Sequence, residues 1–262
     1  MVRRQLVPSR EAARRLIDDA KVLVGGALAD KPARQVLPSD AISLLAPPPP
    51  FVSRAGAKLD AALDEWAIDP AGLVCLDVGS STGGFTDCLL QRGAKQVYAV
   101  DVGTNQLHER LRSNKRVIVR EQTDIRQVRS EQLPEPLDLV VGDVSFISLR
   151  KILAPVVALA DAGVPLLLLV KPQFEAGKQE ASKGRGVITD PAIWRRVLAE
   201  VEAAAVESGA AMLELMPSPI TGTSGNVEFV CRFAVGAPRV DIGPAVERAV
   251  QAVLPPSLFD HD

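Results

Sequence analysis

The amino-acid sequence predicts an α/β protein with a doubly wound, mostly parallel Rossmann-like sheet and a small α+β domain before it. From Leu73 onward, apolar runs of strand length alternate with helical patterns, and a glycine-rich turn follows the first run. A proline run also separates the first 46 residues from the rest. Strand-helix alternation is typical of parallel sheets, whose strands need long crossover connections. A chain of 262 residues has room for both parts.

The first module, residues 1–46, is basic although the whole chain is slightly acidic. It carries eight Lys and Arg residues against five Asp and Glu, a net charge of +3, whereas the whole chain has −2 and the remainder therefore −5. A small basic module beside an acidic domain indicates a polyanionic partner for the small one.

The elements of this module follow from local patterns. Ser9 is placed to cap a helix whose apolar residues between 12 and 20 follow helical spacing. Strand-like residues 22–24, the turn Gly25-Gly26 and a weak strand near residues 41–45 complete a helix-then-hairpin module. Prolines 47–50 form a stiff spacer, so residues 47–52 are predicted to link two domains.

The second domain is predicted over residues 53–235. Its last two strands follow each other without a helical pattern, which indicates an antiparallel hairpin at one edge of the sheet. The tail, residues 236–262, holds one helical pattern near residues 245–254 and has no assigned role. The expected strands are 74–78, 96–101, 117–120, 137–141, 166–170, 212–215 and 227–233, and the expected helices include 86–92, 149–161 and 192–208.

The glycine-rich turn after the first strand indicates a nucleotide site. A buried strand runs into glycines and then a helix, an arrangement that lets backbone approach a ligand closely. The spacing matches neither G-x-G-x-x-G nor a phosphate-binding loop, because the glycines fall at 79, 83 and 84 and no lysine follows. The turn therefore suits the amino-acid carboxylate of S-adenosylmethionine better than a pyrophosphate. The residues predicted to bind this cofactor here are Asp77, Gly79, Ser80, Ser81, Thr82, Gly83, Gly84 and Phe85.

Two further acids follow the next strands. Asp101 closes the second strand, at the distance from the first that suits a carboxylate binding the two ribose hydroxyls of an adenine nucleoside. Asp124 follows the third strand and is predicted to meet the exocyclic amine of adenine. Taken singly, each acid is as readily explained as a helix cap or turn residue, whereas together they favour a cofactor site.

Charged residues also follow the fourth and fifth strands. Asp143 comes after the fourth strand and Lys171 after the fifth, where the apolar run 166–170 meets Pro172. Ligands of open parallel sheets bind beyond the carboxyl ends of the strands, so both side chains are predicted to share the cofactor crevice. Lys58, before the sheet begins, and Glu228, near its end, complete a Lys-Asp-Lys-Glu quartet.

These motifs resemble the TlyA (haemolysin A) family of ribosomal RNA 2′-O-methyltransferases over residues 1–235. The segments that carry the resemblance are Val52–Leu59, Asp77–Thr86, Gly142–Leu149 and Lys171–Glu175, with a weaker likeness to an αL-type RNA-binding module at residues 1–46. One departure is the turn Gly25-Gly26, where that module often has Asn-Gly.

The resemblance implies a methyltransferase that uses S-adenosylmethionine to methylate a ribose 2′-hydroxyl of ribosomal RNA, free or within ribosomal subunits, in the cytoplasm. It places the catalytic roles on Lys58, Asp143, Lys171 and Glu228, and adds Asp143 to the cofactor residues. Lys171 is expected to act as the base or to steer the hydroxyl. The residues expected to contact RNA are Arg3, Arg4, Arg10, Arg14, Arg15 and Arg54.

Other functions remain open alternatives. A membrane-damaging haemolysin-like protein is disfavoured because every apolar run is far shorter than a membrane-spanning helix requires and no signal segment is visible, so stable membrane association is not expected. A non-catalytic ribosome-binding factor is disfavoured by the complete quartet, and a dehydrogenase by the missing G-x-G-x-x-G. Neither His108 nor His261 has a ligand-spaced partner, so no metal is expected.

Overall fold

The computed structural model describes residues 1–254 except 5, 8–9 and 46–48. The chain divides into two compact units, Met1–Pro50 and Phe51–Asp262, and each is described by itself. The break between them falls inside the predicted linker. The predicted helix cap at Ser9 lies outside the described residues.

The first unit packs one helix on a small sheet. Its elements are η1 (Val2–Arg4), α1 (Arg10–Asp18), β1 (Val22–Val24), β2 (Ala27–Leu28) and β3 (Ile42–Leu44). The strands run antiparallel in the order β2-β1-β3, and Leu16 on α1 joins Val22 and Val24 in the core. Gly25 and Gly26 both have positive φ, as a two-residue turn between β1 and β2 requires. The prediction placed residues 41–45 directly across this turn from residues 22–24. In the structure the strand across the turn is β2, and β3 pairs with the opposite edge of β1.

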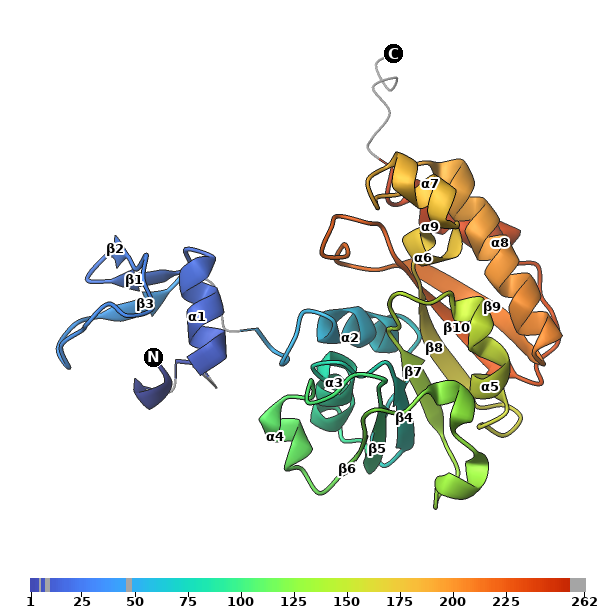
Figure 1. Ribbon diagram of the computed structural model, residues 1–262, viewed down its shortest axis with the longest axis horizontal. Coiled ribbons are helices and arrows are strands. Elements are labelled where there is room, and N and C mark those ends of the chain that lie inside the picture. Colours follow the sequence, from blue (N-terminus) through green and yellow to red (C-terminus); the bar gives the residue numbers. More distant parts are fainter. Residues whose placement is uncertain (5, 8–9, 46–48, 255–262) are drawn as a thin grey trace, which may run out of the picture. The chain divides into compact units, whose positions relative to one another are not determined.

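The second unit is built on one twisted sheet (Figure 1). Within the described residues, seven strands follow the order β6-β5-β4-β7-β8-β10-β9; β10 runs antiparallel to both of its neighbours, β8 and β9, and the other pairings are parallel. The order reverses between β4 and β7, which is where ligands bind in open α/β sheets. The strands are β4 (Val74–Val78), β5 (Gln96–Val100), β6 (Val117–Arg120), β7 (Leu139–Gly142), β8 (Pro165–Val170), β9 (Ala210–Pro217) and β10 (Phe229–Val235).

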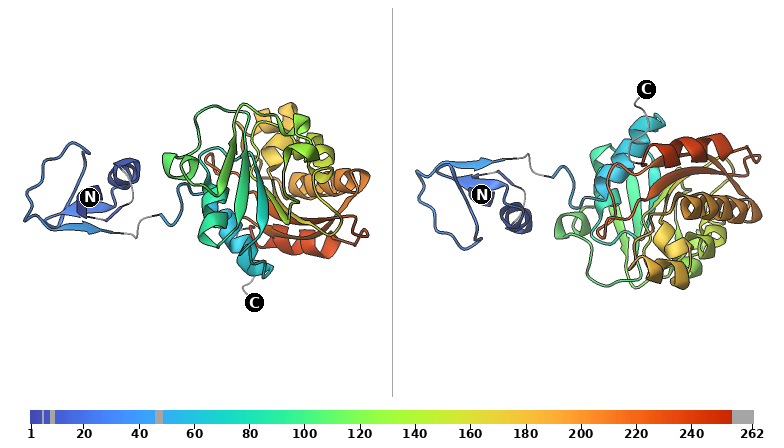
Figure 2. Two further views of the ribbon diagram at one scale, coloured as in Figure 1. Left: turned by 90° about the horizontal axis from the view of Figure 1, so that it is seen from below. Right: turned by 90° about the horizontal axis from the view of Figure 1, so that it is seen from above.

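Helices cover both faces of the sheet (Figure 2). One hydrophobic core joins the sheet to α5, α8 and α9, and a second joins it to α2 and α3. The central strands are buried on both faces, which explains why their sequences are continuous apolar runs. The helices are α2 (Gly56–Glu65), α3 (Gly84–Gln91), α4 (Glu109–Arg112), α5 (Leu153–Val157), α6 (Pro172–Glu175), α7 (Lys178–Lys183), α8 (Pro191–Glu207) and α9 (Gly243–Gln251), with short 3₁₀ turns η2 (Ile125–Gln127), η3 (Ser130–Gln132) and η4 (Leu149–Lys151).

The observed elements correct the sequence expectations at three places. Helix α2 was not expected, and the helix expected over 149–161 is only η4 and α5. Strand β10 begins at Phe229, so Glu228 precedes the strand rather than lying within it. The predicted tail helix is α9, and its buried residues Val246 and Val250 belong to the main core.

Among the described residues, the structure contains no helix with the length and apolar character needed to cross a membrane.

Candidate active site

A cleft lies at the carboxyl ends of β4 and β7, where the strand order reverses. It has two parts, of about 540 and 520 Å³, which share Gly79, Ser81, Asp143, Ser145 and Phe146 in their walls. The larger part also reaches the quartet and the loop 220–224, and the smaller one reaches Asp101 and Asp124. The cleft therefore places the predicted nucleoside residues on one side and the predicted catalytic residues on the other.

The glycines of the turn are required by close contacts. Gly79 has φ +78°, and a Cβ there would lie 3.1 Å from Val144. A Cβ at Gly84 would lie 2.2 Å from the hydroxyl of Ser53 and 2.9 Å from the backbone nitrogen of Gly56. Because Gly84 has no side chain, the segment that leads into α2, the helix carrying Lys58, can pack directly against the start of α3.

Asp77 is fully buried in β4 below this turn. Its Oδ2 accepts hydrogen bonds from the backbone N–H and the hydroxyl of Thr86, at 2.9 and 2.6 Å, which fixes the start of α3. Its Oδ1 has no hydrogen-bond partner among the described residues, and the residue lines the larger part of the cleft. Burial raises the pKa of Asp77 from 3.8 to about 7, against the lowering effect of the Thr86 hydrogen bonds.

This raised pKa predicts a pH dependence of stability. Between the unfolded value of 3.8 and the folded value of about 7, the folded protein binds more protons at Asp77 than the unfolded chain does. The free energy of unfolding should therefore fall as pH rises through this window. Asp77→Asn removes the titration while keeping an acceptor for Thr86, so its urea-unfolding free energy should fall less between pH 5 and 8. Glu65→Gln, at an exposed carboxylate, serves as the control, and equal pH slopes for Asp77→Asn and the parent protein would contradict the assignment.

Asp101 and Asp124 lie where the sequence predicted, but their carboxylates are already engaged. Asp101 accepts hydrogen bonds from the backbone N–H groups of Ser81, at 2.8 Å, and Gly103, at 2.7 Å. Asp124 caps η2 and forms an ion pair with Arg126, which holds its pKa below the usual range. Arg126 is a cleft residue that the sequence reading missed.

The four quartet side chains meet in one connected group. Lys58 Nζ lies 2.6 Å from Glu228 Oε2 and 3.3 Å from Asp143 Oδ2, and Lys171 Nζ lies 2.6 Å from Asp143 Oδ1. Lys58 and Lys171 are each only 7% exposed and Glu228 is 3% exposed. The two lysines and two carboxylates therefore balance one another in a site largely shielded from water.

The topology explains how distant residues meet here. Lys171 follows β8, and β10 pairs antiparallel with β8 so that Phe229 faces Val170. The residue before β10, Glu228, therefore lies at the same edge as the carboxyl ends of the parallel strands. Lys58 reaches this edge from α2, where it is buried beside Leu59 and Ala62, which pack on the sheet.

Two polar side chains that the sequence reading did not single out join the quartet. Lys171 Nζ donates a hydrogen bond to the hydroxyl of Ser145 at 2.7 Å. The amide nitrogen of Gln173 donates to Glu228 Oε1 at 3.4 Å. Both residues line the larger part of the cleft. Ser145 lies two residues after Asp143, and Gln173 lies two residues after Lys171. The sequence does not show that these side chains point into the cleft, because their direction depends on the geometry of the loops.

An aromatic pair lies at the rim of the cleft. Phe146 is 92% exposed and has φ +64°, a backbone conformation that is strained for an aromatic residue. Its ring centroid lies 5.3 Å from that of Phe174. An apolar ring held open to solvent beside buried charges is a feature of ligand-binding surfaces rather than of cores.

The predicted RNA-contacting arginines differ in their surroundings. Arg4 donates hydrogen bonds to the backbone oxygens of Leu37, Pro38 and Asp40, so it holds a loop of the first unit. Arg14 pairs loosely with Asp18 at 3.8 Å, and Arg3 and Arg10 are exposed at the same groove as Arg14. The side chain of Arg15 lies outside what the structure describes. Arg54 is exposed and lines the larger part of the active-site cleft.

The structure also bears on a metal site. In the described part of the chain, no three His, Cys, Asp or Glu side chains come together in a way that could hold a metal ion. The cysteines Cys75, Cys88 and Cys231 are buried and free, and burial raises the pKa of the Cys75 thiol to about 12.

Comparison with known proteins shows the family to which the chain is related. The FtsJ-like methyltransferase family model matches residues 51–234, and the S4 domain model matches residues 1–42. The chain is 41% identical over 255 residues to the 16S/23S rRNA (cytidine-2′-O)-methyltransferase TlyA of Mycobacterium tuberculosis, covering 97% of this chain and 95% of that one. It is also 41% identical over 231 residues to YqxC of Bacillus subtilis, named as a candidate rRNA methyltransferase, covering 88% and 82%.

A solved structure is similar along nearly the whole chain. It is a protein from Streptococcus thermophilus named as a candidate hemolysin, with a TM-score of 0.78 and 37% identity, covering 93% of this chain and 90% of that one. The strand order, the cleft and these matches lead to one assignment. The chain belongs to the TlyA family and joins an S4 domain to a domain of the FtsJ-like methyltransferase family.

Proposed function

We propose that this protein transfers a methyl group from S-adenosylmethionine to the 2′-hydroxyl of a ribose, that of a cytidine, in ribosomal RNA. The observation that carries the proposal is the buried quartet of Lys58, Asp143, Lys171 and Glu228 beside the glycine turn. The M. tuberculosis relative is named for this reaction, and the match to it spans nearly the whole of both chains.

The residues around the glycine turn fit S-adenosylmethionine, which when bound supplies a methyl group on a positively charged sulfur. Asp77 Oδ1, buried and without a hydrogen-bond partner among the described residues, suits the ammonium of the amino-acid part. The N–H groups at the start of α3 suit its carboxylate. Asp101 retains lone pairs for two ribose hydroxyls, and we assign the adenine amine to Asp124.

Proton removal from the acceptor hydroxyl is assigned to Lys171. Its amine contacts Ser145 and Asp143 in the larger part of the cleft, where the acceptor ribose has room to enter. Lys171 would take the proton as a neutral amine, or would steer the hydroxyl as an ammonium, while the new O–C bond forms and the methyl group leaves the sulfur of the donor. Asp143 fixes the amine, and Lys58 with Glu228 holds Asp143 in place. Such placement supplies several kcal/mol of the barrier.

The aromatic rim suits a nucleobase that has left its stack. Phe146 presents nearly its whole side chain to solvent beside Ser145 and the quartet. Stacking of a base on an aromatic ring contributes about 1–3 kcal/mol and tolerates any base, because each has a π face. We therefore assign Phe146 to holding the acceptor nucleotide.

The S4 domain is assigned to general RNA attachment. Arg3, Arg10 and Arg14 surround a groove of about 510 Å³ with Lys31 and Arg34. Such a rim attracts phosphates without reading sequence. The partner we propose is ribosomal RNA, free or in ribosomal subunits, which places the enzyme's work in the cytoplasm.

This role predicts a salt dependence of RNA binding. Arg10→Gln should weaken RNA binding and lower the slope of log affinity against log salt concentration by about 1, because one phosphate contact is lost. Filter binding of an rRNA fragment between about 50 and 300 mM salt measures both. The control is Arg195→Gln, which removes a half-buried arginine of the methyltransferase domain paired with Glu247. An unchanged slope for Arg10→Gln would remove that residue from the RNA contact.

The proposed function is tested by mapping 2′-O-methyl groups on ribosomal RNA incubated with the protein and S-adenosylmethionine. We expect a new 2′-O-methylcytidine. Calorimetry with S-adenosylmethionine is the companion measurement. If the protein binds the cofactor but methylates no rRNA species or subunit, the remaining interpretation is a non-catalytic ribosome-binding factor. If it does not bind the cofactor, the proposal is wrong.

A further inference from the structure

Two loops carry Asp143 and Lys171 of the quartet, and both end at one buried carboxylate. The β7 loop, residues 143–148, carries Asp143, Ser145 and Phe146, and the β8 loop, residues 171–175, consists of Lys171 and the short helix α6. The loops leave neighbouring strands, since Gly142 on β7 pairs with Leu168 on β8. At their far ends they meet through Glu175, the last residue of α6.

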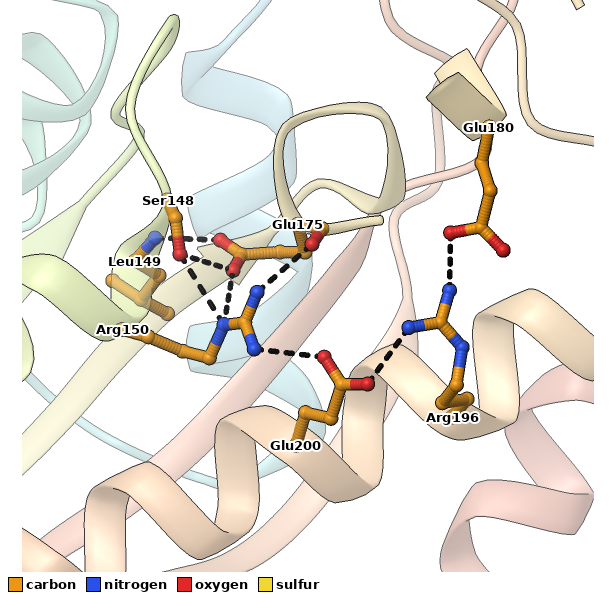
Figure 3. A network of polar contacts seen from close by, with 7 residues as sticks. All are labelled: Ser148, Leu149, Arg150, Glu175, Glu180, Arg196 and Glu200. Carbon is orange, nitrogen blue, oxygen red and sulfur yellow. Dashed lines mark hydrogen bonds and ion pairs between the residues drawn. The ribbon is translucent and has the colours of Figure 1, made fainter. Parts of the chain in front are cut away.

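Glu175 is only 4% exposed, and its carboxylate contacts Ser148 at the end of the β7 loop and Leu149 and Arg150 at the start of η4 (Figure 3). Oε1 accepts the backbone N–H of Leu149 at 2.5 Å. Oε2 accepts the hydroxyl of Ser148 at 2.6 Å and the Nε–H of Arg150 at 3.2 Å. Arg150 also donates to the backbone oxygen of Glu175 at 2.9 Å. A carboxylate that accepts three donors in a dry environment holds them firmly, because charge-assisted hydrogen bonds are about twice as strong as neutral ones.

The near ends of the loops are joined by the active-site contacts themselves. Lys171 Nζ bridges Asp143 and Ser145, and Phe146 packs against Phe174. Each of these contacts depends on the relative position of the two loops. The Glu175 carboxylate thus adds a contact at the far ends of the loops to the strand ladder and to the packing of Val144 and Ile147 on the core.

We propose that Glu175 is a positioning residue for methyl transfer: it closes the two loops into a ring and so fixes Lys171 Nζ against Asp143 and Ser145. This inference rests on the proposed function of the cleft. Glu175 does not line the cleft, so it acts only through the loops. A displacement of a reacting group by about 1 Å lowers rates about 10²-fold.

An outer chain of charges supplies the matched control. Arg150 continues to Glu200 at 2.8 Å, Glu200 contacts Arg196 at 2.7 Å, and Arg196 pairs with Glu180 on α7. Glu200 is about one third exposed and does not touch the β7 loop's backbone. Glu200→Ala therefore removes a partner of Arg150 while leaving the carboxylate of Glu175 in contact with Ser148 and Leu149.

Two substitutions at the carboxylate test the proposal in steady-state kinetics with ribosomal RNA. Glu175→Ala should lower kcat about 10²-fold and leave the KM for S-adenosylmethionine within about threefold, because Asp77 and Asp101, assigned to the amino-acid part and the ribose, lie outside both loops. Glu175→Gln should lower kcat about tenfold: its amide oxygen can still accept from Leu149, but its NH₂ group faces the Arg150 donor. Glu200→Ala should keep kcat within about twofold.

A double variant separates positioning from loss of structure. If Glu175 acts through Lys171, then adding Glu175→Ala to Lys171→Ala should lower the slow single-turnover rate by less than about threefold. The proposal would be overturned if Glu175→Ala lowered the rate by the same factor in the parent protein and in Lys171→Ala. It would also be overturned if the kcat values of Glu175→Ala and Glu175→Gln were within twofold of that of the parent protein. If Glu175→Ala does not fold, Glu175→Gln decides between the same outcomes. Should the parent protein itself transfer no methyl group, the proposed function fails instead.

Discussion

Lys171→Ala should lower the rate of methyl transfer by about 10³-fold while leaving the affinity for S-adenosylmethionine within a few fold. A well-placed base contributes about 10²- to 10⁴-fold. The amine of Lys171 is the quartet nitrogen that also contacts Ser145 and the Phe174 ring, at the side of the cleft open to an acceptor. Its removal leaves Asp143 paired with Lys58, so the buried charges remain partly balanced.

The measurement is single-turnover methylation of ribosomal RNA together with calorimetric cofactor binding. Lys151→Ala, at an exposed lysine on η4, is the matched control and should behave as the parent protein does. Lys171→Ala with ordinary methylation would remove this residue from the reaction. Loss of cofactor affinity together with activity would instead assign it to binding.

Glu228→Ala should lower the free energy of unfolding by about 3 kcal/mol and also abolish methyl transfer. Removing one partner of a buried ion pair leaves the other charge uncompensated, which costs about 3–5 kcal/mol. The side chains of Glu228 and Lys58 are only 3% and 8% exposed. Because Lys58 keeps Asp143 at 3.3 Å, the lower end of that range is expected.

Glu214→Ala provides the contrast on the same hairpin. Glu214 on β9 pairs with Arg232 on β10, but the two side chains are 47% and 32% exposed. Exposed pairs contribute about 0–1 kcal/mol, so this variant should unfold and methylate nearly as the parent protein does. Urea unfolding followed by circular dichroism compares the two. A destabilisation by Glu228→Ala no larger than that by Glu214→Ala would contradict the buried-pair interpretation.

Much of the fold could be predicted because its signals are local. The runs at 74–78 and 166–170 are buried on both faces of the sheet, so they are apolar without interruption and need no other evidence. The position of Asp143 and Lys171 in one cleft then follows from the general rule that parallel strands present their carboxyl ends at one edge.

The rest depends on contacts between residues far apart in the chain. Glu228 enters the site only because β10 runs antiparallel, and the sequence indicates that hairpin without giving its register. The buried hydrogen bonds of Glu175 cannot be predicted from the sequence pattern, because a glutamate at the end of a short helix is ordinarily a surface residue. The ion pair of Asp124 with Arg126 likewise depends on the rotamers of the two side chains, which cannot be predicted from their spacing in the sequence.

The hydrogen bond between Lys58 and Glu228 joins residues 170 positions apart. Contacts of such separation form late, because the intervening chain must first be ordered. During synthesis, the methyltransferase domain thus cannot assemble its quartet until β10 has been made and has inserted beside β8. Because the S4 domain, residues 1–42, precedes the methyltransferase domain in the chain, it is synthesised before the last residue of the quartet.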